Sequence, residues 1–157
     1  MVEFTLTDLE QYLCRHGAEM RHNVARSSNV YNGKIGPQSN EETDLLGLGG
    51  ELAVAKWINV YPDLTKYARQ GGVDLNSDTG KKIDVKTTKY STGKLLAKIN
   101  TAYSDIDIFV LVTGEFPVFT VRGWATKEEL LRPDTIANLG HGNAHCLAQD
   151  KLHTGKF

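Results

Sequence analysis

The chain has 157 residues, of which 40% are hydrophobic and 24% charged, and its formal net charge is −1. This length suits one domain over residues 1–157 with a substantial core, and the composition excludes a disordered or fibrous chain. A net charge near zero excludes a protein that binds nucleic acid over its whole surface. No apolar run approaches the roughly 18 residues of a membrane span, and the first residues do not resemble a signal peptide. We therefore expect a cytoplasmic protein with no membrane partner.

The first predicted element is an amphipathic helix over residues 8–24. Thr7 and Glu10 have the spacing of a capping box, which marks its start. We expect its apolar stripe to pack on the core, with His16 at the core edge and not acting as a ligand. Residues 27–40 are rich in turn-forming residues and predict a surface loop. The stripe consists of Leu9, Tyr12, Leu13, His16 and Met20.

A second helix is predicted over residues 41–59, opened by a capping box of Ser39 and Glu42. Its glycines weaken the helix but would let another backbone approach it closely. The positions three and four residues from Glu51 are apolar or glycine, so Glu51 falls on the inward face. An ionised carboxylate buried there must be protonated, paired with a base or near a metal. The alternative is a glutamate at the boundary of the stripe that reaches solvent or a lysine.

A β-hairpin follows, formed by residues 72–75 and 82–88 around a polar turn. If the turn centres on Thr79, Asp74 lies opposite Asp84 on the paired strands. Two acids that face one another repel, which would destabilise a bare hairpin. A divalent cation between them would reverse that effect. The hairpin therefore predicts a metal site at this pair.

Lysines are concentrated just after this pair of acids. Lys86 lies two residues beyond Asp84 and points to the same side of the sheet. Residues 81–98 contain six lysines and only one acid, Asp84. Such a cluster is ordinarily a solvated strand face. Next to a carboxylate site, it becomes a candidate phosphate-binding surface.

The rest of the chain supports a central sheet. Residues 94–99 fit a strand or a helical turn, and we assign a strand. Residues 107–113 are a near-continuous apolar run, which is typical of a buried central strand. The remaining predicted elements are a strand over 116–122, a short helix opened by the capping box of Thr126 and Glu129 and ended by Pro133, and a strand near 145–148.

Three segments in chain order carry the candidate chemistry: Gly49-Gly50-Glu51, Gly72-Val73-Asp74 and Asp84-Val85-Lys86-Thr87-Thr88. Together with residues 107–112 and 121–126, this ordered set resembles the PD-(D/E)XK nuclease superfamily over residues 41–132. The resemblance implies an α/β, restriction-endonuclease-like fold, in which helices flank a central mixed β-sheet with an αβββαβ-type core. The helix over 8–24 and the tail over 140–157 would be additions. Asp74 follows Val73 and not proline, a departure that the superfamily often shows.

The resemblance implies a Mg²⁺-dependent nuclease that acts on DNA, with RNA as an alternative substrate and Mn²⁺ able to substitute. Asp74 and Asp84 would be metal ligands with the Val85 carbonyl, and Glu51 an outer or second-metal ligand. Lys86 would complete the catalytic set by orienting or deprotonating the attacking water. Because carboxylates favour the charged form of a lysine, electrostatic stabilisation is its expected role. The residues expected to bind nucleic acid are Lys82, Thr88, Lys89, Lys94 and Lys98.

Two other interpretations compete with a nuclease. One is a nuclease-fold module that binds nucleic acid without turnover, although such a module has no chemical need for all four catalytic residues. The other is a zinc site in the tail, but its residues lie in a loop-like segment without a recognised zinc pattern. We expect Cys14 and Cys146 to be reduced thiols, and a homodimer to be compatible with the superfamily. The candidate zinc ligands are His141, His145, Cys146 and His153.

Overall fold

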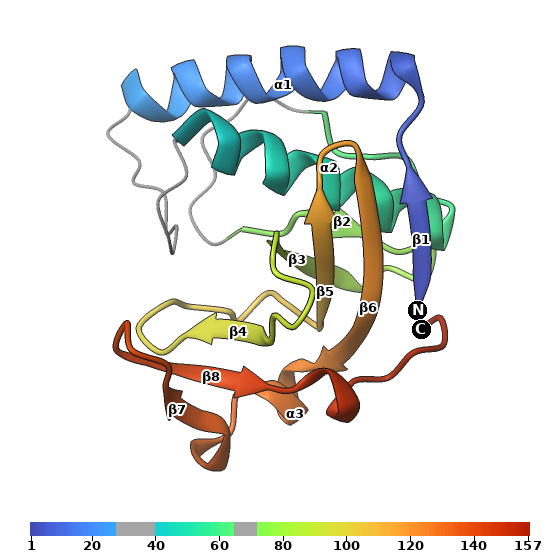
Figure 1. Cartoon of the computed structure of the whole chain (residues 1–157). Coiled ribbons are helices and arrows are strands. Elements are labelled where there is room, and N and C mark those ends of the chain that lie inside the picture. Colours follow the sequence, from blue (N-terminus) through green and yellow to red (C-terminus); the bar gives the residue numbers. More distant parts are fainter. Residues whose placement is uncertain (28–39, 65–71) are drawn as a thin grey trace.

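The computed structural model describes residues 1–27, 40–64 and 72–157. Two helices, α1 (Asp8–Ser27) and α2 (Asn40–Ile58), cover one face of a five-stranded sheet, and a second, three-stranded sheet lies on the other side (Figure 1). Most of the predicted loop over residues 27–40 and the capping residue Ser39 lie outside the described residues. No helix in the described part of the chain is both long and apolar enough to cross a membrane.

The main sheet is mixed, as the sequence predicted, and its strand order is β1-β6-β5-β3-β2. The β3 and β5 strands run parallel, and the other neighbours are antiparallel. The α/β class with helices beside a mixed sheet is therefore confirmed. Its strands are β1 (Val2–Thr5), β2 (Leu75–Asn76), β3 (Lys82–Thr88), β5 (Ile108–Glu115) and β6 (Val118–Thr126).

The second sheet has the order β4-β8-β7. The predicted strands over 94–99 and near 145–148 are confirmed, whereas β1 and β7 were not predicted. The predicted capping box at Thr126 is also confirmed, because both of its reciprocal hydrogen bonds with Glu129 are formed. The elements of this part are β4 (Leu95–Lys98), α3 (Lys127–Leu130), β7 (Ile136–Asn138), β8 (Asn143–Leu147) and short 3₁₀ turns at Pro133–Thr135 and Gln149–Lys151.

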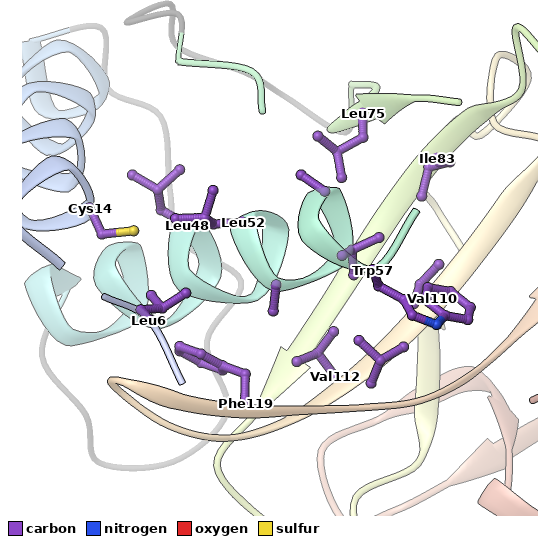
Figure 2. Close-up of a cluster of buried hydrophobic side chains, with 14 of the residues drawn as sticks. Leu6, Cys14, Leu48, Leu52, Trp57, Leu75, Ile83, Val110, Val112 and Phe119 are labelled. Atoms are coloured by element: carbon purple, nitrogen blue, oxygen red, sulfur yellow. The ribbon is translucent and has the colours of Figure 1, made fainter. Parts of the chain in front are cut away.

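The main core lies between the two helices and the sheet. Ile108, Val110 and Val112 of β5 face α2, and Figure 2 shows the latter two among the buried side chains. The alternate residues, Phe109 and Leu111, pack against the second sheet in a separate cluster. Because β5 is buried on both faces, its sequence is apolar without alternation, as predicted.

The inward face of α1 differs from the predicted stripe. The helix and its capping box form as expected, but Leu9 and Tyr12 remain 67% and 65% exposed, and the exposed His16 ring stacks on Tyr12. Cys14 and Ala18 are buried instead. Small side chains on this face let α1 approach α2 closely, because larger residues would hold the two helices apart. The prediction that His16 lies at the core edge was therefore wrong.

Gly50 permits an equally close contact between α2 and β3. A Cβ atom at this position would overlap the hydroxyl of Thr87, whereas one at Gly47 would meet no atom within 4 Å. We therefore expect Gly50→Ala to lower the free energy of unfolding by about 1–3 kcal/mol through overpacking. Gly47→Ala is the matched control and should raise it by about 0.5–1 kcal/mol through helix propensity. Urea unfolding of both variants measures the difference, and equal stabilities would contradict the close contact.

Candidate active site

The hairpin forms in the predicted register, with Leu75 opposite Ile83. Asp74 immediately precedes the short β2 strand, and its backbone N–H donates to the Ile83 carbonyl at 2.9 Å. Its carboxylate Oδ2 accepts a hydrogen bond of 2.7 Å from the backbone N–H of Val85. Asp74 is thus held against the edge of β3, next to the residues between Asp84 and Lys86.

Asp84 and Lys86 lie on the same face of β3 and form an ion pair of 2.8 Å between Oδ2 and Nζ. The Asp84 side chain is only 4% exposed, and that of Lys86 is 33% exposed. Despite this short contact, Oδ2 accepts no hydrogen bond of suitable angle from any residue that the structure describes. The contact is therefore electrostatic, and a buried carboxylate oxygen keeps capacity for a further ligand.

Lys86 is held in its protonated form. Burial would lower the pKa of Lys86, but the charge of Asp84 acts against it, with further contributions from Tyr103 and Asp74, and the net shift is upward. The ammonium also lies 5.4 Å from the centre of the Tyr103 ring, a cation–π contact. The direction of this shift agrees with the sequence-based expectation that nearby acids favour the charged lysine.

Glu51 points inward from α2, as predicted, but its partner comes from α1. Its Oε2 accepts a hydrogen bond of 3.0 Å from Arg21 within a largely buried ion pair. The Cys14 thiol lies in the same region, since its pKa is raised to about 11 by burial and by the charges of Glu10 and Glu51. Sequence reasoning did not identify Arg21, although its spacing from Cys14 and Ala18 places it on the inward face of α1.

The structure brings Asp74, Asp84 and Lys86 together, and Glu51 is held separately toward α1. Alternation along β3 directs Ile83 and Val85 into the core under α2, so Asp84 and Lys86 point to the opposite face. Within the described residues, no group of three or more His, Cys, Asp or Glu side chains could hold a metal ion. The site is therefore a pair of aspartates with one lysine and not a cluster of three acids.

This donor set suits a hard divalent cation. The Val85 N–H points to the β2 side of the strand, and a residue in a strand directs its carbonyl to the same side as its N–H. Asp74, Asp84 and the Val85 carbonyl therefore offer oxygen atoms at one edge. Mg²⁺ commonly uses one or two carboxylates and retains several waters, so it would not require Glu51 as a ligand.

A cleft of about 320 Å³ opens beside Lys86. The end of β3, the first half of α2 and the neighbouring β4 and β8 strands form its walls (Figure 1). No acidic side chain is among the described residues of its lining. Lys82 is exposed and does not line the cleft, and its backbone N–H donates to Asp107. The predicted nucleic-acid-binding residues that do line it are Thr88, Lys89, Lys94 and Lys98.

The histidines of the tail make contacts within the protein. His145 Nδ1 lies 2.9 Å from the Thr135 hydroxyl, and His153 Nε2 lies 2.8 Å from Glu129 Oε1. The His153 ring also packs on Trp124 at a centroid distance of 4.5 Å. Both cysteines are free thiols, as expected.

No family model, no curated protein and no solved structure matches this chain. Function must therefore be inferred from the residues and their geometry.

Proposed function

We propose that this chain is a Mg²⁺-dependent nuclease of the PD-(D/E)XK type, with a restriction-endonuclease-like fold, that hydrolyses phosphodiester bonds in DNA. The observation that supports it most is the 2.8 Å pair of Asp84 and Lys86, with Asp74 held at the same strand. Lys86 also lines the lysine-rich cleft, so the candidate catalytic group and the candidate phosphate-binding surface are continuous.

Each residue has a separate role in this proposal. Asp74, Asp84 and the Val85 carbonyl would hold the cation, which when bound supplies charge neutralisation at the phosphoryl group and the leaving oxygen. Lys86 stays protonated, so it donates hydrogen bonds to the attacking water and to the developing negative charge and does not act as a general base. The other lysines of the cleft would position the flanking phosphates.

A binding module without turnover is the second candidate. The pairing of Glu51 with Arg21 favours it, because this carboxylate is engaged in an ion pair between helices and not beside Asp84. Such a module would keep the lysine-lined cleft and bind nucleic acid with no requirement for Mg²⁺. The two candidates therefore differ in metal-dependent turnover and not in binding.

Incubation of the protein with linear, circular and branched DNA, in Mg²⁺ and in EDTA, tests the nuclease proposal. We expect cleavage of at least one substrate in Mg²⁺ and none in EDTA. Cleavage of circular DNA would establish internal cutting. Binding without cleavage of any substrate, in Mg²⁺ or Mn²⁺, would favour the module without turnover.

The cleft lysines should govern affinity more than turnover. We expect Lys94→Ala and Lys98→Ala each to weaken binding in Ca²⁺ and to reduce the slope of log affinity against log salt by about 0.7–0.9, the effect of one lost phosphate contact. Lys151→Ala is the control, because its side chain is 68% exposed and does not line the cleft. Fluorescence anisotropy over a range of salt concentrations measures the slope. An equal effect of all three substitutions would contradict a specific phosphate surface in the cleft.

A further inference from the structure

The size of the cleft restricts which form of nucleic acid it can accept. Its volume of about 320 Å³ is at the lower end of small-molecule sites, which span about 300–1,000 Å³. It is enclosed by α2 on one side and by β4 and β8 on another. Phosphates on the surface of a duplex cannot enter such a hollow with their paired bases, whereas an unpaired nucleotide can.

The lining has two kinds of surface. Leu46, Val85 and Leu111 provide apolar side chains, and lysines supply the charge. A nucleobase has apolar faces, and its phosphate is anionic, so an unpaired nucleotide matches both surfaces. Proteins that bind single strands combine the same two features, a positively charged groove and sites where bases stack.

Tyr90 provides a stacking surface at this cleft. Its side chain is 52% exposed, and the Lys89 ammonium lies 5.5 Å from the centre of its ring. The turn that carries it is fixed, because the Gly93 N–H donates to the Tyr90 carbonyl at 2.9 Å. Gln149 donates from Nε2 to the carbonyls of Ser91 and Gly93, both at 2.8 Å. An exposed aromatic ring on an anchored turn can bind a base with little loss of conformational entropy.

We propose that this cleft binds a single strand of DNA, with one base stacked on Tyr90 and the adjoining phosphates against Lys89, Lys94 and Lys98. The inference rests on the proposed function for its choice of DNA and for the reaction that follows binding. It makes the substrate of the nuclease a strand with unpaired nucleotides, such as a single-stranded end or flap.

Binding in EDTA, where no cleavage is expected, tests the inference directly. The probes are a labelled single strand of about 16 nucleotides, at the upper end of single-strand site sizes, and a duplex of the same sequence. We expect the single strand to bind at least about tenfold more tightly. Tyr90→Ala should weaken its binding by about 5- to 150-fold, the range for loss of one stacked base. Tyr90→Phe retains the ring and should stay within about threefold of the wild type.

Tyr61→Ala is the matched control, because Tyr61 is 82% exposed and lines a different groove, near α1. Preference for the duplex, no binding of the single strand, or equal effects of Tyr90→Ala and Tyr61→Ala would overturn the inference. Cleavage assays separate this failure from that of the nuclease proposal. Mg²⁺-dependent cutting of duplex DNA that Tyr90→Ala leaves unchanged would remove the single-strand site and keep the nuclease. Tyr90-dependent binding without any cutting would do the reverse.

Discussion

Asp84→Ala should abolish Mg²⁺-dependent cleavage and leave a folded protein. The substitution removes a carboxylate whose buried Oδ2 accepts no hydrogen bond of suitable angle from any residue in the described ranges. Loss of one preorganised electrostatic group at a reacting centre typically costs about 10²–10³-fold in rate, and loss of a metal ligand should cost at least that much. The fold should survive, because Lys86 is a third exposed and can be solvated once its partner is gone.

Single-turnover cleavage at saturating DNA measures this effect, and circular dichroism checks the fold. Asp78→Ala is the matched control, since Asp78 is exposed in the turn of the same hairpin. Asp74→Ala should lose cleavage as well, with an added loss of stability of about 1 kcal/mol because the Val85 N–H loses its acceptor. Wild-type cleavage by either the Asp74 or the Asp84 variant would rule out the proposed metal site.

Lys86→Met should reduce both stability and cleavage. It removes the charge that faces Asp84, so a carboxylate that is 4% exposed remains without its ion-pair partner. We expect the free energy of unfolding to fall by about 3 kcal/mol, the lower end of the range for breaking a buried pair, because Lys86 itself is partly exposed. Cleavage should fall by orders of magnitude, while DNA binding in Ca²⁺ is retained.

The double variant Lys86→Met with Asp84→Asn isolates the electrostatic part of this loss. It should recover most of the stability, since no unpaired charge remains. Urea unfolding of the four proteins completes the cycle. If Asp84→Asn alone stabilised the protein in EDTA, repulsion between carboxylates would dominate over the ion pair. If Lys86→Met matched Lys94→Ala in both binding and turnover, Lys86 would be only a phosphate contact.

The raised pKa of Lys86 also sets a pH dependence. A lysine whose pKa is higher in the folded state stabilises the fold fully below its unfolded value of about 10.4. This stabilisation is lost as the pH rises through the folded value. The stability difference between wild type and Lys86→Met that arises from this shift should therefore be constant near neutral pH and shrink only at alkaline pH.

Local patterns predicted the elements that hold the candidate site. The register of the hairpin follows from a short turn centred on Thr79, and it was correct at Leu75 and Ile83. The buried β5 strand followed from its apolar run, and the inward direction of Glu51 followed from its helical neighbours. Each of these depends on residues close in sequence, where periodicity and turn chemistry are informative.

Contacts between distant residues were not predictable in the same way. The Arg21–Glu51 pair joins two helices, and β1 forms only because it pairs with β6 more than 100 residues later. The larger apolar side chains of α1 suggested the wrong inward face, since close packing of helices selected Cys14 and Ala18. Which side of a helix is buried depends on the surface opposite it, and no local pattern contains that surface.

The parallel pairing of β3 with β5 separates two roles along the chain. Parallel neighbours cannot be joined by a tight turn and need a crossover of about a dozen residues or more. Here the crossover is residues 89–107, and it contains β4, Tyr90 and most of the lysines of the cleft. The proposed metal ligands all precede it. Substitutions within the crossover could therefore change which strand is bound, while the hairpin that would perform the chemistry stays intact.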